Sequence, residues 1–556
     1  MYRQVRLRIG FVLLFVLSYC HLQAQVTNSA QLDYEAAIKV LRDGAYKEAL
    51  DKLNQLERAG FKDKGFYRYR GEAKFELEDF QGAAEDLDKV RLTSDDPKVF
   101  GMLGICKYQQ HEWEAAKYFL LKAIPNGFKH SKGHLYLGYL YYEGYEHPQC
   151  VEQLNAAEKG GEKEIKLFQY RGVAAYHAGD KQLAISDLTK VVKARKAELK
   201  TYEVLGLAYA TDDKRTFALP FLNKADSMKS MDSKVYFELG MCLDADKKFD
   251  RAIDAYSRAI ELNYPGTAVY TARGKSKISA GKVKESLVDF DQVVKMKPER
   301  ADGYRDRVEA SVRLNDWAKV VTDLVLTQAL GSPSTDDYAL LAVAKFNLKN
   351  FQGALEDVNN AIIKGAENYS VNGKKHSIYF LQGQCLVANK QFEAAAAALE
   401  KAEAQGEHTD DMYLERARAY VGMRKYEKAI NDLEMAQKNN SKDANLFYNS
   451  AVIKEEIGDV GAAVLDYTQA IKLNPKDALA YYGRGNGKAK KGNLSEALAD
   501  LDEAISLDGT NAAFFKSRGN VYYQLKNKDK ACFDWRKAVE YGDEKARFSI
   551  DQYCKK

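Results

Sequence analysis

The stretch "YFELGMCLDADKKFDRAIDAYSRAIELNYP" (residues 236–265) contains the pattern that decides the fold. Its Gly240 belongs to a column of small residues, mostly glycine, that recurs through nearly the whole chain. Of the fourteen intervals in this column, twelve are 34 residues long, one is 33 and one is 41. Because a fixed period of this length is typical of stacked helix–turn–helix units, the sequence predicts an all-α repeat array. The column consists of Ala37, Gly71, Gly104, Gly138, Gly172, Gly206, Gly240, Gly274, Val308, Ala342, Gly383, Ala417, Ala451, Gly485 and Gly519.

Other columns of the period indicate two helices packed closely together. Alanine stands twelve residues after the column in twelve of fifteen repeats, and it recurs nineteen residues after the column. We expect the larger apolar residues nine and sixteen after the column, such as Trp113 and Leu120, to fill the space between the helices. A glycine such as Gly179 or Gly458 follows the first helix and predicts a left-handed C-cap. Prolines such as Pro298 fall just past a second helix, which they cannot continue.

The quoted stretch and "YNSAVIKEEIGDVGAAVLDYTQAIKLNPKD" (448–477) resemble tetratricopeptide repeats. Fifteen such repeats cover roughly residues 30–545. The resemblance implies a right-handed α-solenoid superhelix whose concave face is lined by the first helix of each repeat and binds peptides or partner proteins. The terminal segment implies a C-terminal capping helix, of which residues 546–556 form the end.

Repeat nine interrupts the regular pattern. Its small columns are replaced by Val308, Val320 and Thr327, and the single long interval inserts seven residues around 365–377. Because bulkier contacts push helices apart, we expect an altered superhelical pitch or a hinge between about residues 300 and 378. The sequence therefore predicts an N-terminal array over 30–330 and a C-terminal array over 336–545.

The N-terminus is unlike the repeats. It carries three arginines, then an apolar run from Ile9 to about Tyr19 that is too short to span a membrane. We expect residues 1–24 to be a secretory signal cleaved after Ala24; a lipoprotein modified at Cys20 and an uncleaved anchor remain alternatives. The closing string "KACFDWRKAVEYGDEKA" (530–546) resembles the last repeat of exported Bacteroidota tetratricopeptide proteins. This resemblance favours the periplasm of a Gram-negative envelope over a eukaryotic secretory route. We expect any association with the outer membrane to go through a partner.

The charge balance and the cysteine positions bear on the kinds of partner and on the packing of the chain. Signal cleavage removes three of the 84 basic residues, so the mature chain has 81 basic and 79 acidic residues. This balance gives no reason to expect the basic stripe that nucleic-acid binding needs. Cys106, Cys242 and Cys385 lie two residues after the small column, where we expect them to pack between helices. If the C-terminal segment folds back at Gly542, Cys532 meets Cys554, and both a disulfide and two packed thiols remain open.

Motifs for chemistry are weak. His130 and His134 have the spacing of a metal pair, but no nearby carboxylate or cysteine completes a set. "GRGNGKAKKGN" (483–493) lacks the Ser or Thr of a phosphate loop, and its glycines already belong to the repeat. We therefore expect no catalytic residue, no metal and no cofactor.

The variable surface is a stripe on each first helix, formed by residues three before, one after and four after the small column. In the N-terminal half this stripe is aromatic, which suits either partner binding or packing between repeats. In the last two repeats it is polar, and Asn486, Lys516 and Asn520 partly resemble a carboxylate clamp for C-terminal peptides. The predicted partner-binding residues are Phe75, Tyr108, Tyr139, Tyr142, Tyr176, Phe237, Asn486 and Asn520.

These patterns favour a non-catalytic scaffold that organises envelope proteins, for instance in secretion or outer-membrane assembly. A periplasmic peptide receptor or chaperone with an aromatic concave groove is the alternative. The predicted partners are envelope proteins or peptides, without nucleic acid and without a membrane span in the mature chain. The sequence does not name the partner.

Overall fold

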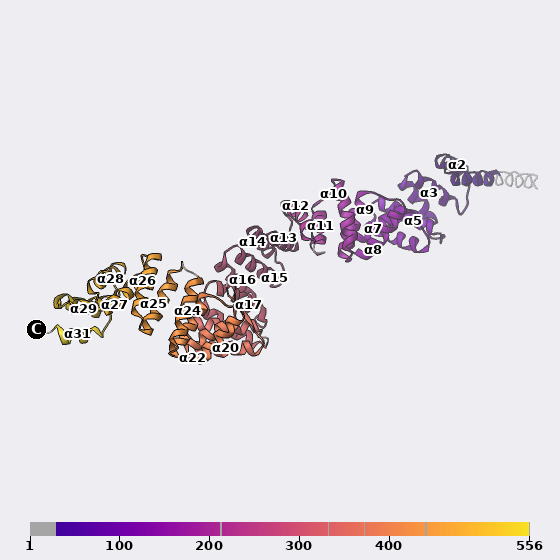
Figure 1. Ribbon diagram of the computed structural model, residues 1–556. Coiled ribbons are helices and arrows are strands. Elements are labelled where there is room, and N and C mark those ends of the chain that lie inside the picture. Colours follow the sequence, from indigo (N-terminus) through magenta and orange to yellow (C-terminus); the bar gives the residue numbers. More distant parts are fainter. Residues whose placement is uncertain (1–28, 212–213, 332, 372, 440–441, 555–556) are drawn as a thin grey trace, which may run out of the picture. The chain divides into compact units, whose positions relative to one another are not determined.

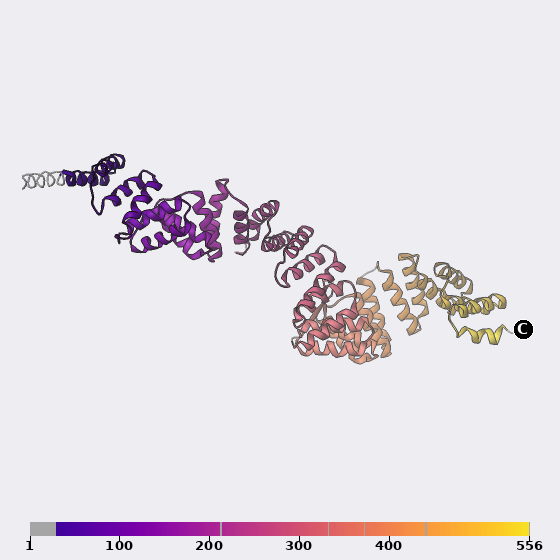
Figure 2. The ribbon, with the colours of Figure 1, turned by 180° about the vertical axis from the view of Figure 1, so that it is seen from behind.

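The computed structural model describes residues 29–211, 214–331, 333–371, 373–439 and 442–554, and these form fifteen helical hairpins, as predicted (Figure 1). The same succession of hairpins is visible from behind (Figure 2). The first hairpin joins residues 29–42 to α2 (Tyr46–Arg58). The others are α3 (Phe66–Glu76) with α4 (Phe80–Val90), α5 (Pro97–Gln109) with α6 (Trp113–Ala123), α7 (Ser131–Glu143) with α8 (His147–Lys159), α9 (Ile165–His177) with α10 (Lys181–Lys193), α11 (Leu199–Thr211) with α12 (Arg215–Ser227), α13 (Ser233–Ala245) with α14 (Phe249–Glu261), α15 (Ala268–Ser279) with α16 (Val283–Met296), α17 (Ala301–Arg313) with α18 (Trp317–Ala329), α19 (Thr335–Asn347) with α20 (Phe351–Ile363), α21 (Ile378–Ala388) with α22 (Phe392–Ala404), α23 (Asp410–Gly422) with α24 (Tyr426–Asn439), α25 (Ala444–Ile457) with α26 (Val460–Leu473), α27 (Ala478–Lys490) with α28 (Leu494–Leu507), and α29 (Ala512–Gln524) with α30 (Lys528–Glu540).

The small column lets the two helices of each hairpin touch. In repeat four, a Cβ added at Gly138 would lie only 2.4 Å from the Cδ2 atom of Leu154, sixteen residues later. Gly104 meets Leu120 in the same way, at 2.6 Å. The predicted contact between the small column and the large residue sixteen after it is therefore confirmed. The free cysteines of the neighbouring column, Cys106, Cys242 and Cys385, are buried as predicted.

In the described turns inside the hairpins, one residue has a left-handed backbone. The predicted glycines have it, with φ of +92° at Gly179 and +94° at Gly458. Other repeats place a lysine, an arginine or another side chain there, for example Lys390 with φ of +59°. Because a side chain in this region costs about 1 kcal/mol, the packing of the hairpin imposes a conformation that the local sequence does not favour.

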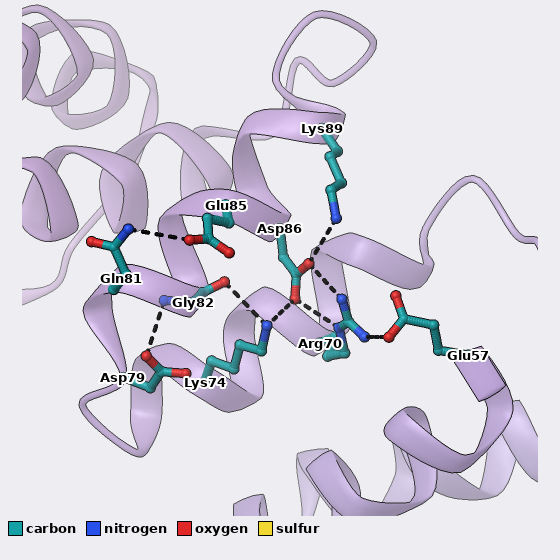
Figure 3. A network of polar contacts seen from close by, with 9 residues as sticks. All are labelled: Glu57, Arg70, Lys74, Asp79, Gln81, Gly82, Glu85, Asp86 and Lys89. Carbon is teal, nitrogen blue, oxygen red and sulfur yellow. Dashed lines mark hydrogen bonds and ion pairs between the residues drawn. The ribbon is translucent and has the colours of Figure 1, made fainter.

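A buried ion network supports the packing inside and between repeats (Figure 3). The Arg70 guanidinium on α3 donates from Nε and Nη2 to both oxygens of Asp86 on α4, each at 2.7 Å. It also pairs with Glu57 on α2, in the preceding repeat. One side chain thus joins three helices and two repeats. The same bidentate contact, over sixteen residues, links Arg171 to Asp187, Arg307 to Asp323, Arg416 to Asp432, Arg484 to Asp500 and Arg518 to Asp534.

A second cation strengthens the first of these pairs. Lys74 Nζ lies 2.8 Å from Asp86 Oδ2 and donates to the carbonyl oxygen of Gly82 at 3.3 Å (Figure 3). Burial alone would raise the pKa of Asp86, but the hydrogen bonds from Arg70 and Lys74 outweigh it and hold that pKa below its usual range. Asp86 is therefore a carboxylate at neutral pH.

The insertion around residues 365–377 contains a pair of β-strands. Strands β1 (Asn368–Val371) and β2 (Lys374–Ser377) pair antiparallel, with Asn368 opposite Ser377. Val371 packs against the apolar cluster that contains Val308 and Val312, so the hairpin covers part of the region where repeat nine lacks small residues. Among the described residues, this is the one departure from the expected all-α architecture.

The last repeat is closed by α31 (Ala546–Tyr553), which follows a turn at Gly542 with φ of +100°. A disulfide joins Cys532 on α30 to Cys554, so the bonded alternative for this pair is the one that the structure shows. The Tyr553 ring lies 4.5 Å from that of Tyr523, measured between centroids, and completes an aromatic cluster with Trp535. The predicted C-terminal cap is confirmed.

Contacts between Cα atoms divide the chain into two units, Met1–Ser276 and Lys277–Lys556. The division that the sequence predicts between residues 330 and 336, and the change of superhelical pitch between 300 and 378, stay predictions. The predicted signal peptide over residues 1–24, with Cys20, lies outside the described residues.

Candidate functional site

A cleft of about 510 Å³ lies across repeats three, four and five of the first unit. Four aromatic rings form its walls: Tyr108 of α5, Trp113 of α6, Tyr139 of α7 and Tyr170 of α9. We call this the aromatic cleft. Its other lining residues are Glu114, Lys117, Leu140, Glu143, Gly144 and Lys166.

Trp113 gives the aromatic cleft an accessible rim. It is the first residue of α6, and 45% of its surface is exposed. Its ring centroid lies 5.0 Å from that of Tyr108, with the planes inclined at 65°. The sequence predicts Trp113 in the space between the helices, and this holds in part: the ring contacts Tyr108 of the paired helix, but 45% of the residue is exposed. At a helix start only one side of a large ring meets the paired helix, so the other side remains open to solvent.

Stacked tyrosine pairs hold the three first helices together. Tyr108 on α5 stacks on Tyr136 of α7 with centroids 4.1 Å apart, and Tyr142 on α7 stacks on Tyr170 of α9 at 3.9 Å. Burial raises the pKa of both Tyr108 and Tyr142 to about 12, so both phenols are protonated at neutral pH. The residues four after the small column therefore take part in packing between repeats, and one of them, Tyr108, also lines the cleft.

Two further phenols donate to glutamates. Tyr139 is only 3% exposed, and its hydroxyl donates to Glu164 Oε1 at 2.5 Å. The Tyr170 hydroxyl donates to Glu143 Oε1 at 3.0 Å. Burial, followed by these hydrogen bonds, raises the pKa of each tyrosine above its usual value. The rings are thus fixed in position before any ligand arrives.

Two lysines lie at the edges of the aromatic cleft. Lys117 Nζ pairs with Glu146 Oε1 at 2.5 Å. Lys166 Nζ lies 4.7 Å from the centroid of Tyr139 and 5.1 Å from that of Tyr170. Attraction between an ammonium and these rings is worth about 0.5–1 kcal/mol at an exposed site and helps to hold Lys166 over them.

The other predicted aromatic residues lie outside this cleft. Phe75 is only 5% exposed and packs against Phe80 and His130, and a binding role for it stays a prediction. Tyr142 and Tyr176 are half-buried and pack against the core of repeats five and six. Phe237 stacks on Tyr264, with centroids 4.4 Å apart. A binding role for Tyr142, Tyr176 and Phe237 stays a prediction.

Sequence reasoning did not select Trp113, Tyr170 or Lys166 as binding residues. Trp113 was assigned to packing by its column, and Tyr170 and Lys166 lie two and six residues before the small column of repeat five, outside the chosen stripe. The signal that could have found Tyr170 is its match to Tyr136, which stands two residues before the column of repeat four. Each of these two rings receives the tyrosine of the preceding repeat.

The polar stripe of the last two repeats is largely engaged within the chain. Lys516 Nζ pairs with Asp543 Oδ2 at 2.9 Å, and Asn520 Oδ1 accepts a hydrogen bond from the indole of Trp535 at 2.9 Å. Asn486 is half-buried on α27. Lys516 and Asn520 therefore serve the C-terminal cap, and a peptide-binding role for Asn486 and Asn520 stays a prediction.

The weak chemical motifs are explained by helix packing. The glycines of 483–493 lie largely within α27, where no phosphate loop can form. The His130 side chain accepts from the backbone N–H of Lys132 at the start of α7, while His134 contacts Gln153. Within the described ranges no group of three or more His, Cys, Asp or Glu residues is placed to hold a metal ion. None of the helices there is long and apolar enough to cross a membrane.

Comparisons with known proteins agree with the repeat pattern. Two models of the tetratricopeptide repeat match the chain, one over residues 414–478 and 482–543 and the other over 233–264 and 376–404. No curated protein sequence matches.

Solved structures to which the chain is similar include the following three. A tetratricopeptide repeat protein from Parabacteroides merdae is 17% identical, with 46% of this chain and 99% of that chain covered and a TM-score of 0.37. The C-terminal part of a TPR repeat-containing protein from Cytophaga hutchinsonii is 17% identical, with coverage of 44% and 99% and a TM-score of 0.35. The Cut9–Hcn1 complex is 13% identical, with coverage of 93% and 95% and a TM-score of 0.33.

The chain thus contains tetratricopeptide repeats over the matched residues, set in a series of helical hairpins of the same construction.

Proposed function

We propose that this protein is an exported interaction scaffold that holds a segment of a partner protein in the aromatic cleft. Tetratricopeptide arrays are protein–protein interaction scaffolds and are generally not catalytic. The observation that carries the proposal is the cleft itself: about 510 Å³ of space walled by Tyr108, Trp113, Tyr139 and Tyr170. Rigid aromatic rings with polar tips are the side chains that most often dominate binding energy at protein interfaces.

The size and construction of the cleft suit a chain segment. A volume of this size takes one or two large side chains, not a folded domain. The ring positions are fixed by stacking and by the hydrogen bonds to Glu143 and Glu164, so little conformational entropy is lost on binding. Trp113 is the exception, because its exposed half has contact area still to bury.

Trp113→Ala tests the site directly. Truncation of an aromatic anchor of this kind commonly costs more than about 2 kcal/mol, or roughly thirtyfold in affinity. Tyr118→Ala is the matched control, because Tyr118 lies on the same helix, is 61% exposed and does not line the cleft. We expect partners recovered with tagged protein from cross-linked cells to be lost with Trp113→Ala and kept with Tyr118→Ala. Equal recovery with both variants would place the binding surface elsewhere.

The same recovery experiment separates the two functional classes. A small set of partners in fixed ratio favours the scaffold, for instance in secretion or outer-membrane assembly. A broad set of unfolded clients favours a periplasmic peptide receptor or chaperone. In either case circular dichroism should show unchanged helix content, because Trp113 is half exposed.

Export into the envelope is supported by the basic and apolar N-terminal segment and by the disulfide between Cys532 and Cys554, since disulfides persist in oxidising compartments. N-terminal sequencing of the mature protein should give Gln25 as the first residue. A lipid on Cys20 would replace this proposal with a lipoprotein, and an intact Met1 would replace it with an uncleaved anchor.

A further inference from the structure

Lys166 is the one cleft lysine whose charge is not matched by a carboxylate. Its ammonium lies over the Tyr139 and Tyr170 rings, and no carboxylate oxygen of the described chain lies within 4.0 Å of it. Lys117, by contrast, is paired with Glu146. The free N–H donors of Lys166 are thus available to a ligand in the cleft.

Two glutamates are hydrogen-bonded to the same two tyrosines that lie beneath Lys166. Glu164 accepts the Tyr139 hydroxyl, and Glu143 accepts the Tyr170 hydroxyl. These bonds leave the rings beneath the ammonium with their faces toward Lys166. The tyrosines and glutamates therefore form a platform for the lysine without neutralising it.

The cleft is lined by charges of both signs: Glu114 and Lys117 on α6, Glu143 on α7 and Lys166 on α9. Lys117 is paired with Glu146, and Glu143 accepts the Tyr170 hydroxyl. Lys166 is therefore the lining cation whose donors are open to an acidic group in the cleft.

We propose, on the basis of the proposed function, that the aromatic cleft selects a protein segment in which a large apolar side chain is followed directly by Asp or Glu. The apolar side chain packs against the exposed part of the Trp113 ring inside the cleft, and the carboxylate accepts hydrogen bonds from Lys166. The acid belongs to the interior of the segment, not to a chain terminus. The lining residues come from three successive repeats, so a bound segment crosses the cleft and continues past it.

Capped peptides provide the test. Immobilised, N-acetylated and C-amidated decapeptides of alanine and serine would carry Phe, Leu or Ala at a central position, followed by Asp, Glu, Asn, Gln or Lys. Full-length wild-type protein should bind the peptides with Phe or Leu, and those with Asp or Glu about tenfold more tightly than those with Asn or Gln. Binding of the acidic peptides should weaken as salt concentration rises.

Lys166→Met should remove the preference for the acid and leave the preference for the apolar side chain. Lys163→Met is the matched control, because it removes the same charge three residues away from an exposed site outside the cleft lining. It should bind like the wild type. Retained acid preference in Lys166→Met, or its loss in Lys163→Met as well, overturns the role of Lys166.

The remaining outcomes separate this inference from the proposed function. Selection of Phe and Leu without regard to the next residue overturns the acidic partner and leaves the cleft as the binding site. Binding only of peptides with a free C-terminus overturns the interior acid. If wild type prefers no peptide over the alanine control and Trp113→Ala changes nothing, both the inference and the proposed cleft function fail.

Discussion

The buried pair of Arg70 and Asp86 permits a sharp test, because another repeat of the same chain shows what can replace it. In repeat three the equivalent positions hold Leu103 and Phe119, and both side chains are buried in one apolar cluster. We therefore consider Arg70→Leu, Asp86→Phe and the double variant. The double variant rebuilds in repeat two an arrangement that already packs in the neighbouring repeat.

The three variants should differ in a defined order. Asp86→Phe leaves the Arg70 guanidinium, whose side chain is 6% exposed, with only Glu57 as an acid partner, and loss of one member of a buried pair costs about 3–5 kcal/mol. Arg70→Leu is milder, about 1–3 kcal/mol, because Lys74 still neutralises Asp86. In the double variant Glu57 is 43% exposed and can be hydrated. Lys74, 16% exposed, loses Asp86, but the equivalent Lys107 of repeat three pairs with Glu112, where repeat two has Asp79. We expect it within about 1.5 kcal/mol of the wild type.

Local stability is the appropriate measurement, because a repeat array need not unfold in one step. Amide hydrogen exchange of α3 and α4 reports the free energy of opening of repeat two directly. The coupling energy between the two positions should be favourable by at least about 2 kcal/mol. If the double variant is destabilised by the sum of the single effects, the pair acts as two independent side chains, and our account of the buried network is refuted.

Three further predictions concern the packing column, an acid and the cap. Gly138→Ala should destabilise its repeat by about 1–3 kcal/mol, because the new Cβ lies 2.4 Å from the facing leucine. The same change at Gly461, where no atom lies nearer than 3.6 Å, should stabilise the protein by about 0.5 kcal/mol. A shift of the thermal unfolding temperature in the same direction for both variants contradicts this. The folded-state pKa of Asp86 is lowered, so its contribution to the stability of repeat two is complete above its unfolded pKa of about 4. This contribution is lost as pH falls through the folded-state pKa, and the protection of α4 against hydrogen exchange should fall in that range. Asp86→Asn should make the protection less dependent on pH there. Cys554→Ser removes a disulfide that spans 22 residues and should destabilise the C-terminal cap by about 3 kcal/mol. Hydrogen exchange in α31 measures this loss, and reduction of the wild-type protein by dithiothreitol should have the same effect. Unchanged exchange in α31 would show that packing alone holds the cap.

The array itself could be predicted from the sequence, because its determinants are local and repeated. Gly138 must be small since the facing leucine touches its backbone, and a small residue stands at this position in all repeats except repeat nine, mostly at a spacing of 34. The cysteines beside the column and the glycine C-caps follow from the same periodicity, whereas the sequence leaves the cap disulfide open because Cys554 lies beyond the last repeat. Position in the repeat was enough to place the cysteines beside the column and the glycines because each repeat contacts mainly its neighbours.

The tertiary structure decided the contacts of side chains that are not repeated from one unit to the next. The repeat pattern did not predict the contact between Arg70 and Asp86, because only seven repeats carry arginine directly before the column. Each of those seven arginines has an aspartate sixteen residues later. Neither residue is expected in a core until its partner is known, since a buried charge is stable only when paired. Within the binding stripe, sequence position could not separate buried Phe75 from half-buried Tyr108.

The aromatic cleft depends on the same distinction. Trp113 stands at a position that is normally a packing column, and the sequence shows its type and place but not the side of the ring that remains uncovered. Lys166 lies outside the chosen stripe, and its open ammonium results from two hydrogen bonds between tyrosines and glutamates of neighbouring repeats. Periodicity determines which helices meet. The side chains that remain exposed between them are decided by packing in three dimensions, because the exposed area of each ring depends on neighbours in other repeats.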